Sequence, residues 1–101
     1  DYAVNLSYFV EDLLDIFGSN VPILIAELGQ EGASPQQYSV FLTREAQISV
    51  VESFSLPNVV FLPTSPYVVT TDPRFDGVHH YYGRADTIIQ IGKAFGREII
   101  R

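Results

Sequence analysis

The sequence predicts an α/β protein with a parallel sheet. Two short runs, residues 22–28 and 59–62, are almost continuously apolar, which is typical of strands covered on both faces. Helix-like segments precede, separate and follow these runs, giving the order helix, strand, helix, strand, long loop, helix. That alternation is the pattern of parallel strands joined by right-handed helical crossovers.

The first segment, residues 2–17, has the periodicity of an amphipathic helix. Its large apolar residues recur at steps of four and three and therefore share one helical face: Tyr2, Leu6, Phe9, Leu13 and Ile16. Gly18 follows at the position of a C-terminal cap. We expect the helix to end there, and the first strand to run from Pro22 to Leu28.

A second helix is predicted from Ser34 to about Ser53. Ser34 suits the N-cap and Pro35 suits the first helical position. Gln37 is placed to reach back to the N-cap in the manner of a capping box. We therefore expect the helix to begin at these residues.

The sheet that these strands form is incomplete. The second strand, residues 59–62, ends at Pro63, and residues 67–70 are a weaker candidate for a third. A closing helix from about Tyr82 is indicated by an apolar stripe of Ile88, Ile91, Phe95 and Ile99. Since sheets typically hold about 4 to 6 strands, we expect residues 1–101 to be the C-terminal portion of a single larger domain, or to complete the sheet with another chain.

Composition excludes several classes of function. The chain has 101 residues, 47% hydrophobic and 18% charged, which is the makeup of a globular domain and not of a disordered tail. Its net charge of -6 leaves no basic stripe for nucleic acid. No apolar stretch approaches the length of a membrane span. With no cysteine, disulfides and thiolate metal sites are excluded, and we expect no cofactor.

The run Asp76-Gly77-Val78-His79-His80 is the strongest chemical signal in the chain. If the segment turns, Asp76 can accept a hydrogen bond from one ring nitrogen of His79, which leaves the other nitrogen as a proton acceptor. This is the base half of a serine-type triad. Asp76 and His79 are therefore the candidate catalytic residues.

Two loops follow the predicted strands and are expected to face one pocket. The loop of residues 63–81 carries the Asp76–His79 pair, and residues 29–33 form the other loop. Open parallel sheets bind ligands at the carboxyl ends of their strands. Nearby, Glu27 could also line that pocket, but an edge carboxylate that reaches solvent is the expectation. Arg44 and Glu45 are expected on an exposed or sheet-edge helix face.

Five segments of the chain form an ordered set. They are Tyr2-x-x-Asn5-Leu6 before a helix, the strand Val21-Pro22-Ile23 to Leu28-Gly29, Arg44-Glu45-Ala46-Gln47, Pro57-Asn58-Val59-Val60, and Asp76-Gly77-Val78-His79 followed by a helix with Ile91-Gly92. In this order they resemble the C-terminal half of the sialate O-acetylesterase type of carbohydrate esterase, a branch of the SGNH hydrolases. The resemblance covers nearly the whole chain.

The resemblance implies a three-layer α/β/α, flavodoxin-like fold and hydrolysis of acetyl esters on carbohydrates. Asp76 and His79 match the family's last motif, in which the aspartate orients the histidine and the histidine activates a serine. The family's serine lies near the start of the domain in a Gly-x-Ser-Asn type motif, which this chain lacks. The chain alone is therefore expected to be inert, and an extracellular or periplasmic location would fit the family.

Other interpretations of these residues stay open. Asp76 could cap the following helix, with His79 exposed beside it. His80 stands where the family commonly has an aromatic residue, which indicates a packing or solvent-facing substitute. A metal site of Asp72, Asp76, His79 and His80 is a minor alternative without a standard ligand spacing. At the level of function, the alternative to an esterase is a non-catalytic structural or carbohydrate-binding unit that assembles with other chains.

Overall fold

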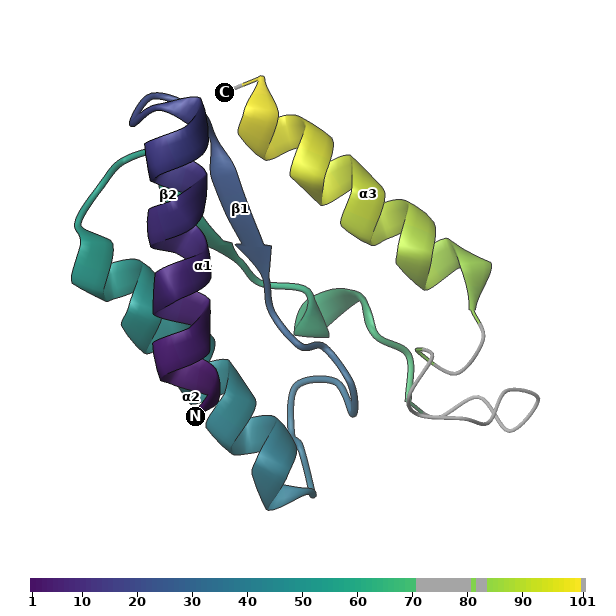
Figure 1. Ribbon diagram of the computed structural model, residues 1–101. Helices are drawn as coiled ribbons and strands as arrows, with labels where there is room; N and C mark the ends of the chain where they lie inside the picture. The colour runs from purple at the N-terminus through teal and green to yellow at the C-terminus, as the bar shows by residue number, and fades with distance from the viewer. Residues whose placement is uncertain (71–80, 82–83, 101) are drawn as a thin grey trace.

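The computed structural model describes residues 1–70, 81 and 84–100 (Figure 1). Within these residues the elements are α1 (Tyr2–Phe17), β1 (Ile23–Ala26), α2 (Tyr38–Phe54), β2 (Val59–Leu62), the short 3₁₀ helix η1 (Ser65–Tyr67) and α3 (Ala85–Ile99). The order matches the predicted alternation of helices and strands. The protein is therefore a mixed α/β structure.

The two strands pair in parallel, as predicted. The register sets Ile23 opposite Val59 and Ala26 opposite Leu62, and α2 forms the crossover between the strands. The Ile23 N–H donates to the Asn58 carbonyl at 2.7 Å, and the Glu27 N–H donates to the Leu62 carbonyl at 2.8 Å. Because backbone groups alternate in direction along a strand, those of Leu24 and Ala26 point away from β2.

The helices lie on both sides of this small sheet (Figure 1). On one side, Val10 of α1 packs with Ile23 and Val59. Half-buried side chains from α1, α2, β1 and the α2–β2 connection surround them: Leu6, Leu13, Leu14, Ile25, Val51, Phe54 and Leu56. On the other side, Leu24 and Val60 line a cleft with Ile99 of α3. Helices thus lie over both faces of the strands, which agrees with their continuous apolar sequence.

The first helix has the predicted bounds, but its buried face is rotated from the predicted stripe. Asp1 caps it by accepting the Val4 N–H at 3.1 Å, and Gly18, at φ +91°, donates its N–H to the Leu14 carbonyl. Val10 is fully buried, whereas three members of the stripe are largely exposed: Tyr2, Phe9 and Ile16. Part of the apolar surface of α1 therefore has no cover within the described residues.

The second helix begins later than predicted. It starts at Tyr38, and Gln37 at its N-cap position has an extended backbone with no side-chain cap. The carboxylate of Glu31 instead accepts the N–H groups of Gln36, at 2.6 Å, and Gln37, at 3.3 Å. These bonds hold the preceding residues in a turn, so the expected start at Ser34 is wrong. The helix ends at Phe54, one residue beyond the expected Ser53.

The predicted third strand is absent from the described residues. Tyr67 belongs to η1, and residues 68–70 do not pair with the sheet. The Thr87 hydroxyl of α3 donates to the Tyr67 carbonyl at 3.1 Å, so this segment bonds to a helix instead of a strand. The closing helix begins at Ala85 because Arg84 has an extended backbone, and residues 82–83 lie outside the described set.

None of the helices within residues 1–70 and 84–100 has both the length and the apolar character needed to cross a membrane. This finding agrees with the absence of a long apolar stretch from the sequence.

Candidate functional site

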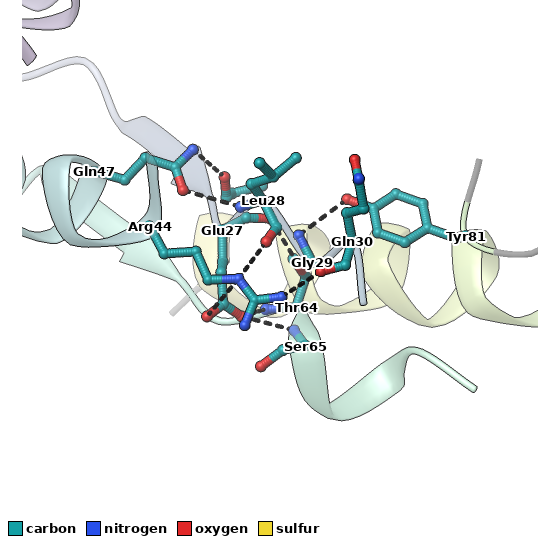
Figure 2. A network of polar contacts seen from close by, with 10 residues as sticks. Glu27, Leu28, Gly29, Gln30, Arg44, Gln47, Thr64, Ser65 and Tyr81 are labelled. Atoms are coloured by element: carbon teal, nitrogen blue, oxygen red, sulfur yellow. Dashed lines mark hydrogen bonds and ion pairs between the residues drawn. The ribbon is translucent and has the colours of Figure 1, made fainter. Parts of the chain in front are cut away.

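The predicted catalytic pair, Asp76 and His79, lies outside the described residues, and so do Asp72 and His80. Their pairing therefore stays a prediction. The described residues do form the carboxyl ends of β1 and β2 and parts of the loops that follow them, which is the edge of the sheet where the sequence predicts a pocket. Side chains from both strand ends, from α2 and from Tyr81 meet there in one network of polar contacts (Figure 2).

Glu27 joins the two strand ends. It follows β1 directly, and one oxygen of its carboxylate accepts the backbone N–H groups of Thr64, at 3.0 Å, and Ser65, at 2.7 Å. The Thr64 hydroxyl returns a bond to the Glu27 carbonyl at 2.8 Å. The Glu27 side chain is only 12% exposed. The expectation that it reaches solvent is therefore wrong, because the start of the loop after β2 folds over it.

Arg44 holds the loop after β1. Its Nε donates to the Leu28 carbonyl and its Nη2 to the Gln30 carbonyl, both at 2.6 Å. The same Nε lies 4.0 Å from the second carboxylate oxygen of Glu27. Arg44 is 6% exposed, so of the two expected positions the exposed one is wrong for it and the sheet-edge one agrees with its bonds beside the end of β1, whereas its neighbour Glu45 is exposed. The planar, forked guanidinium can bond two carbonyls at once.

Gln47 satisfies the backbone where β1 ends. Its amide oxygen accepts the Leu28 N–H at 2.9 Å, and its amide nitrogen donates to the Ala26 carbonyl at 3.1 Å. Gln47 is buried, and both of its polar ends are bonded. A buried polar side chain is tolerated when its hydrogen bonds are made. Arg44 and Gln47 together attach α2 to the β1 loop.

Tyr81 connects the far end of the second loop to this network. Its hydroxyl oxygen accepts the Gly29 N–H at 3.3 Å. Gly29 is buried, and a Cβ there would lie 2.5 Å from the Thr64 hydroxyl oxygen and 3.0 Å from a Tyr81 ring carbon. Only glycine leaves room for both contacts. The residues before and after the Asp76–His79 run thus meet at the end of β1.

The electrostatics of the described part of the site are dominated by Glu27 and Arg44, which face each other. Within the described residues, no group of three potential metal ligands among histidine, cysteine, aspartate and glutamate is close enough to hold an ion. The metal alternative involves residues outside this set. The network holds the two loops together, and in it the Thr64 hydroxyl donates to the Glu27 backbone carbonyl and not to its carboxylate.

A second charged contact lies at the start of α3. Arg84 donates through Nε and Nη2 to the two carboxylate oxygens of Asp86, at 2.9 and 2.7 Å. These hydrogen bonds lower the pKa of Asp86 below its ordinary value of 3.8. The contact is at the surface and concerns the stability of the helix start, not the chemistry of the strand ends.

Arg44 and Gln47 are the site residues whose role was missed in the sequence. The buried positions of α2 are Val40, Arg44, Gln47 and Val50, spaced by four, three and three. A polar pair at inward positions of a helix that follows a buried strand is a detectable signal, because such side chains must find buried partners.

Comparison of the chain with models of protein families, with curated proteins and with solved structures finds no match in any of the three.

Proposed function

We propose that these residues are the C-terminal portion of a serine esterase that removes acetyl groups from carbohydrates, and that they supply the aspartate and histidine of its triad. The observation that carries the proposal is the junction of the two loops at the carboxyl end of the parallel strands, through Glu27 to Thr64 and Ser65 and through Gly29 to Tyr81. The loop so anchored contains Asp76 and His79. In open parallel sheets this edge is where ligands bind.

The proposed chemistry needs a serine from another segment. His79 takes the proton of that serine hydroxyl as its oxygen attacks the acetyl carbonyl, and then gives the proton to the departing sugar oxygen. Water then attacks the carbonyl of the acetyl-enzyme while His79 takes its proton, and His79 returns that proton to the serine oxygen as the bond to the acetyl group breaks and acetate leaves. Asp76 orients the imidazole and stabilises the imidazolium in both steps.

The same proposal extends to the fold. α1 and α2 lie on one side of the strands and α3 on the other (Figure 1), an arrangement that supports a three-layer α/β/α, flavodoxin-like domain of the SGNH type. Further strands of that sheet would come from a segment before Asp1 or from another chain. The esterase motif with its serine belongs, on this proposal, to the same segment.

The test is acetyl-ester hydrolysis by the full-length protein. His79→Ala should lower kcat for 4-nitrophenyl acetate by about 10²- to 10⁴-fold, the usual contribution of a general base. His80→Ala is the matched control, since it removes a neighbouring imidazole that has no role in the proposed triad, and it should keep wild-type turnover. Equal turnover of wild type and His79→Ala would refute the esterase proposal.

One observation favours the alternative of a non-catalytic unit that assembles with other chains. Tyr2, Phe9 and Ile16 of α1 are exposed although they are apolar, and Ile16 is 71% exposed. Such surfaces commonly mark sites of protein contact. The test is an activity assay together with size-exclusion chromatography of the full-length protein. If the protein lacks acetylesterase activity, and if it elutes as an assembly that Phe9→Glu breaks up, this alternative replaces the first.

A further inference from the structure

One flank of α1 carries a line of exposed apolar side chains, which we call the α1 stripe. It consists of Tyr2, Phe9 and Ile16, whose side chains are between 46% and 71% exposed. They recur every seven residues, which is close to two turns of an α-helix, so they lie in line along the helix axis. Leu6 and Leu13, which alternate with them in the sequence, pack against the core. α1 therefore uses one flank for its own core and presents the neighbouring flank outward.

Apolar clefts continue the α1 stripe at both ends of the helix. At the N-terminal end, Tyr2 lines a cleft with Leu42 of α2, which is also exposed. At the C-terminal end, the exposed residues Phe17 and Val21 line a second cleft. Since a half-exposed large side chain offers on the order of 100 Å², the stripe and these three further residues expose about 600 Å². A standard protein interface takes about 800 Å² from each partner, so this surface could supply most of one.

The charges of α1 are divided unevenly between its two halves. Glu11, Asp12 and Asp15 lie in the C-terminal half, and all three are exposed. Residues 2–8 carry no charged side chain, and the helix has no lysine, arginine or histidine. An anionic lipid surface would therefore repel α1. A partner that covers the stripe must present an uncharged or positive surface to the acidic half.

A second copy of the chain supplies that surface when the two α1 helices run antiparallel. With Phe9 on the two-fold axis, Tyr2 of one copy faces Ile16 of the other, because both lie seven residues from Phe9. Residues 11–15 then face residues 3–7 of the second copy, which are uncharged. The carboxylates also approach the N-terminal end of the second helix, where the helix dipole favours negative charge. In a parallel pair, the same carboxylates would face one another and repel.

We propose that α1 forms the interface of a two-fold symmetric dimer, in which the α1 stripe of one copy packs antiparallel on the stripe of a second copy, with Phe9 against Phe9. Two features carry the inference: the spacing of the stripe is symmetric about Phe9, and the acidic half of the helix faces an uncharged half. The inference does not rest on the proposed function, because no residue of the stripe belongs to the polar network at the strand ends.

The first test is sedimentation velocity of the full-length protein and of its variants. The wild type should sediment as a dimer. Phe9→Glu sets two carboxylates against each other on the two-fold axis and should weaken the dimer by about 100-fold, because like charges in an interface repel. Tyr8→Glu is the matched control, since Tyr8 is the exposed neighbour of Phe9 but lies on another face of α1, and it should keep the dimer. A mixture of Phe9→Glu and Phe9→Lys should form a dimer again, which also shows that both variants are folded.

The second test determines the direction of the helices by disulfide cross-linking. Residues 1–101 contain no cysteine, and the oxidised wild type gives the background. A disulfide requires two Cα atoms within about 7 Å, so only residues that face each other are linked. Phe9→Cys should link with itself, and Tyr2→Cys should link with Ile16→Cys. Tyr2→Cys should link with itself no more than Ile89→Cys does, because Ile89 is exposed on α3, on the other side of the sheet.

Four outcomes overturn the proposal. One is a wild type that stays monomeric up to about 100 μM, because another segment of the protein or a different partner then covers the stripe. Another is equal dissociation by Tyr8→Glu and Phe9→Glu, and a third is a dimer that persists in Phe9→Glu. The fourth is self-linkage of Tyr2→Cys above the level of Ile89→Cys, which indicates parallel helices. Because these measurements need no substrate, they judge the interface whether or not the protein hydrolyses acetyl esters.

Discussion

Replacement of Arg44 by methionine tests whether the buried network holds the strand ends. The substitution keeps an unbranched apolar stem of similar bulk and removes the guanidinium. The carbonyls of Leu28 and Gln30, each now bonded to Arg44 at 2.6 Å, lose that donor. Glu27, which is 12% exposed, loses the positive charge 4.0 Å from its carboxylate.

The expected loss follows from these contacts. A hydrogen bond to a charged group contributes about 1.5 to 3 kcal/mol. Two such bonds sum to about 3 to 6 kcal/mol. Part of that sum is offset because burying the Arg44 guanidinium costs desolvation free energy, and the methionine variant does not have that cost. We therefore expect Arg44→Met to lower the free energy of unfolding by about 3 kcal/mol, which for a domain of this size lowers Tm by about 12 to 24 °C.

The assay is urea unfolding followed by far-UV circular dichroism. Glu45→Gln is the matched control: it changes the charge of the adjacent, exposed residue and should alter stability by less than about 0.5 kcal/mol. Arg44→Lys should fall between the two, because an ammonium keeps the charge but cannot replace the fork. If Arg44→Met and Glu45→Gln unfold at the same urea concentration, the buried network does not stabilise the strand ends.

Two further outcomes are expected. Gln47→Leu leaves the Ala26 carbonyl and the Leu28 N–H without their side-chain partner and should cost about 2 kcal/mol in the same urea assay, and an unchanged midpoint would show that these groups find other partners. Asp86→Asn should lower Tm near neutral pH, because the pKa of Asp86 is depressed by its hydrogen bonds to Arg84. That stabilisation is present above the ordinary pKa of 3.8 and is lost as the pH falls through the lower pKa that Asp86 has in the folded protein. The difference in Tm between Asp86→Asn and wild type should therefore shrink in acid. A difference in Tm that is independent of pH contradicts this origin.

The order of elements could be predicted because it depends on local patterns. The apolar periodicity and Gly18 predict the observed bounds of α1. The continuous apolar run at residues 59–62 predicts the observed bounds of β2. Helix starts were harder, since they depend on which side chain takes the free N–H groups. Ser34 has the right chemistry for an N-cap, yet the carboxylate of Glu31 takes the N–H groups of Gln36 and Gln37 instead.

The candidate site could be located by position but not in detail. That loops after parallel strands share an edge is a general rule, and the bonds from Glu27 to Thr64 and Ser65 agree with it. The burial of Arg44 could not be read from residue type, because a helical arginine is usually exposed. Its burial depends on two carbonyls that turn toward it only in the folded loop.

Gln47 also determines how β1 can meet another strand. The outward backbone groups of a strand are a ready template for foreign strands and for aggregation. At the end of β1, the Ala26 carbonyl and the Leu28 N–H are already occupied by the two ends of one amide. A strand that added along this edge would meet the amide of Gln47 at those two positions, so it would diverge from β1 there. A single glutamine thus limits how far along β1 the sheet can be extended.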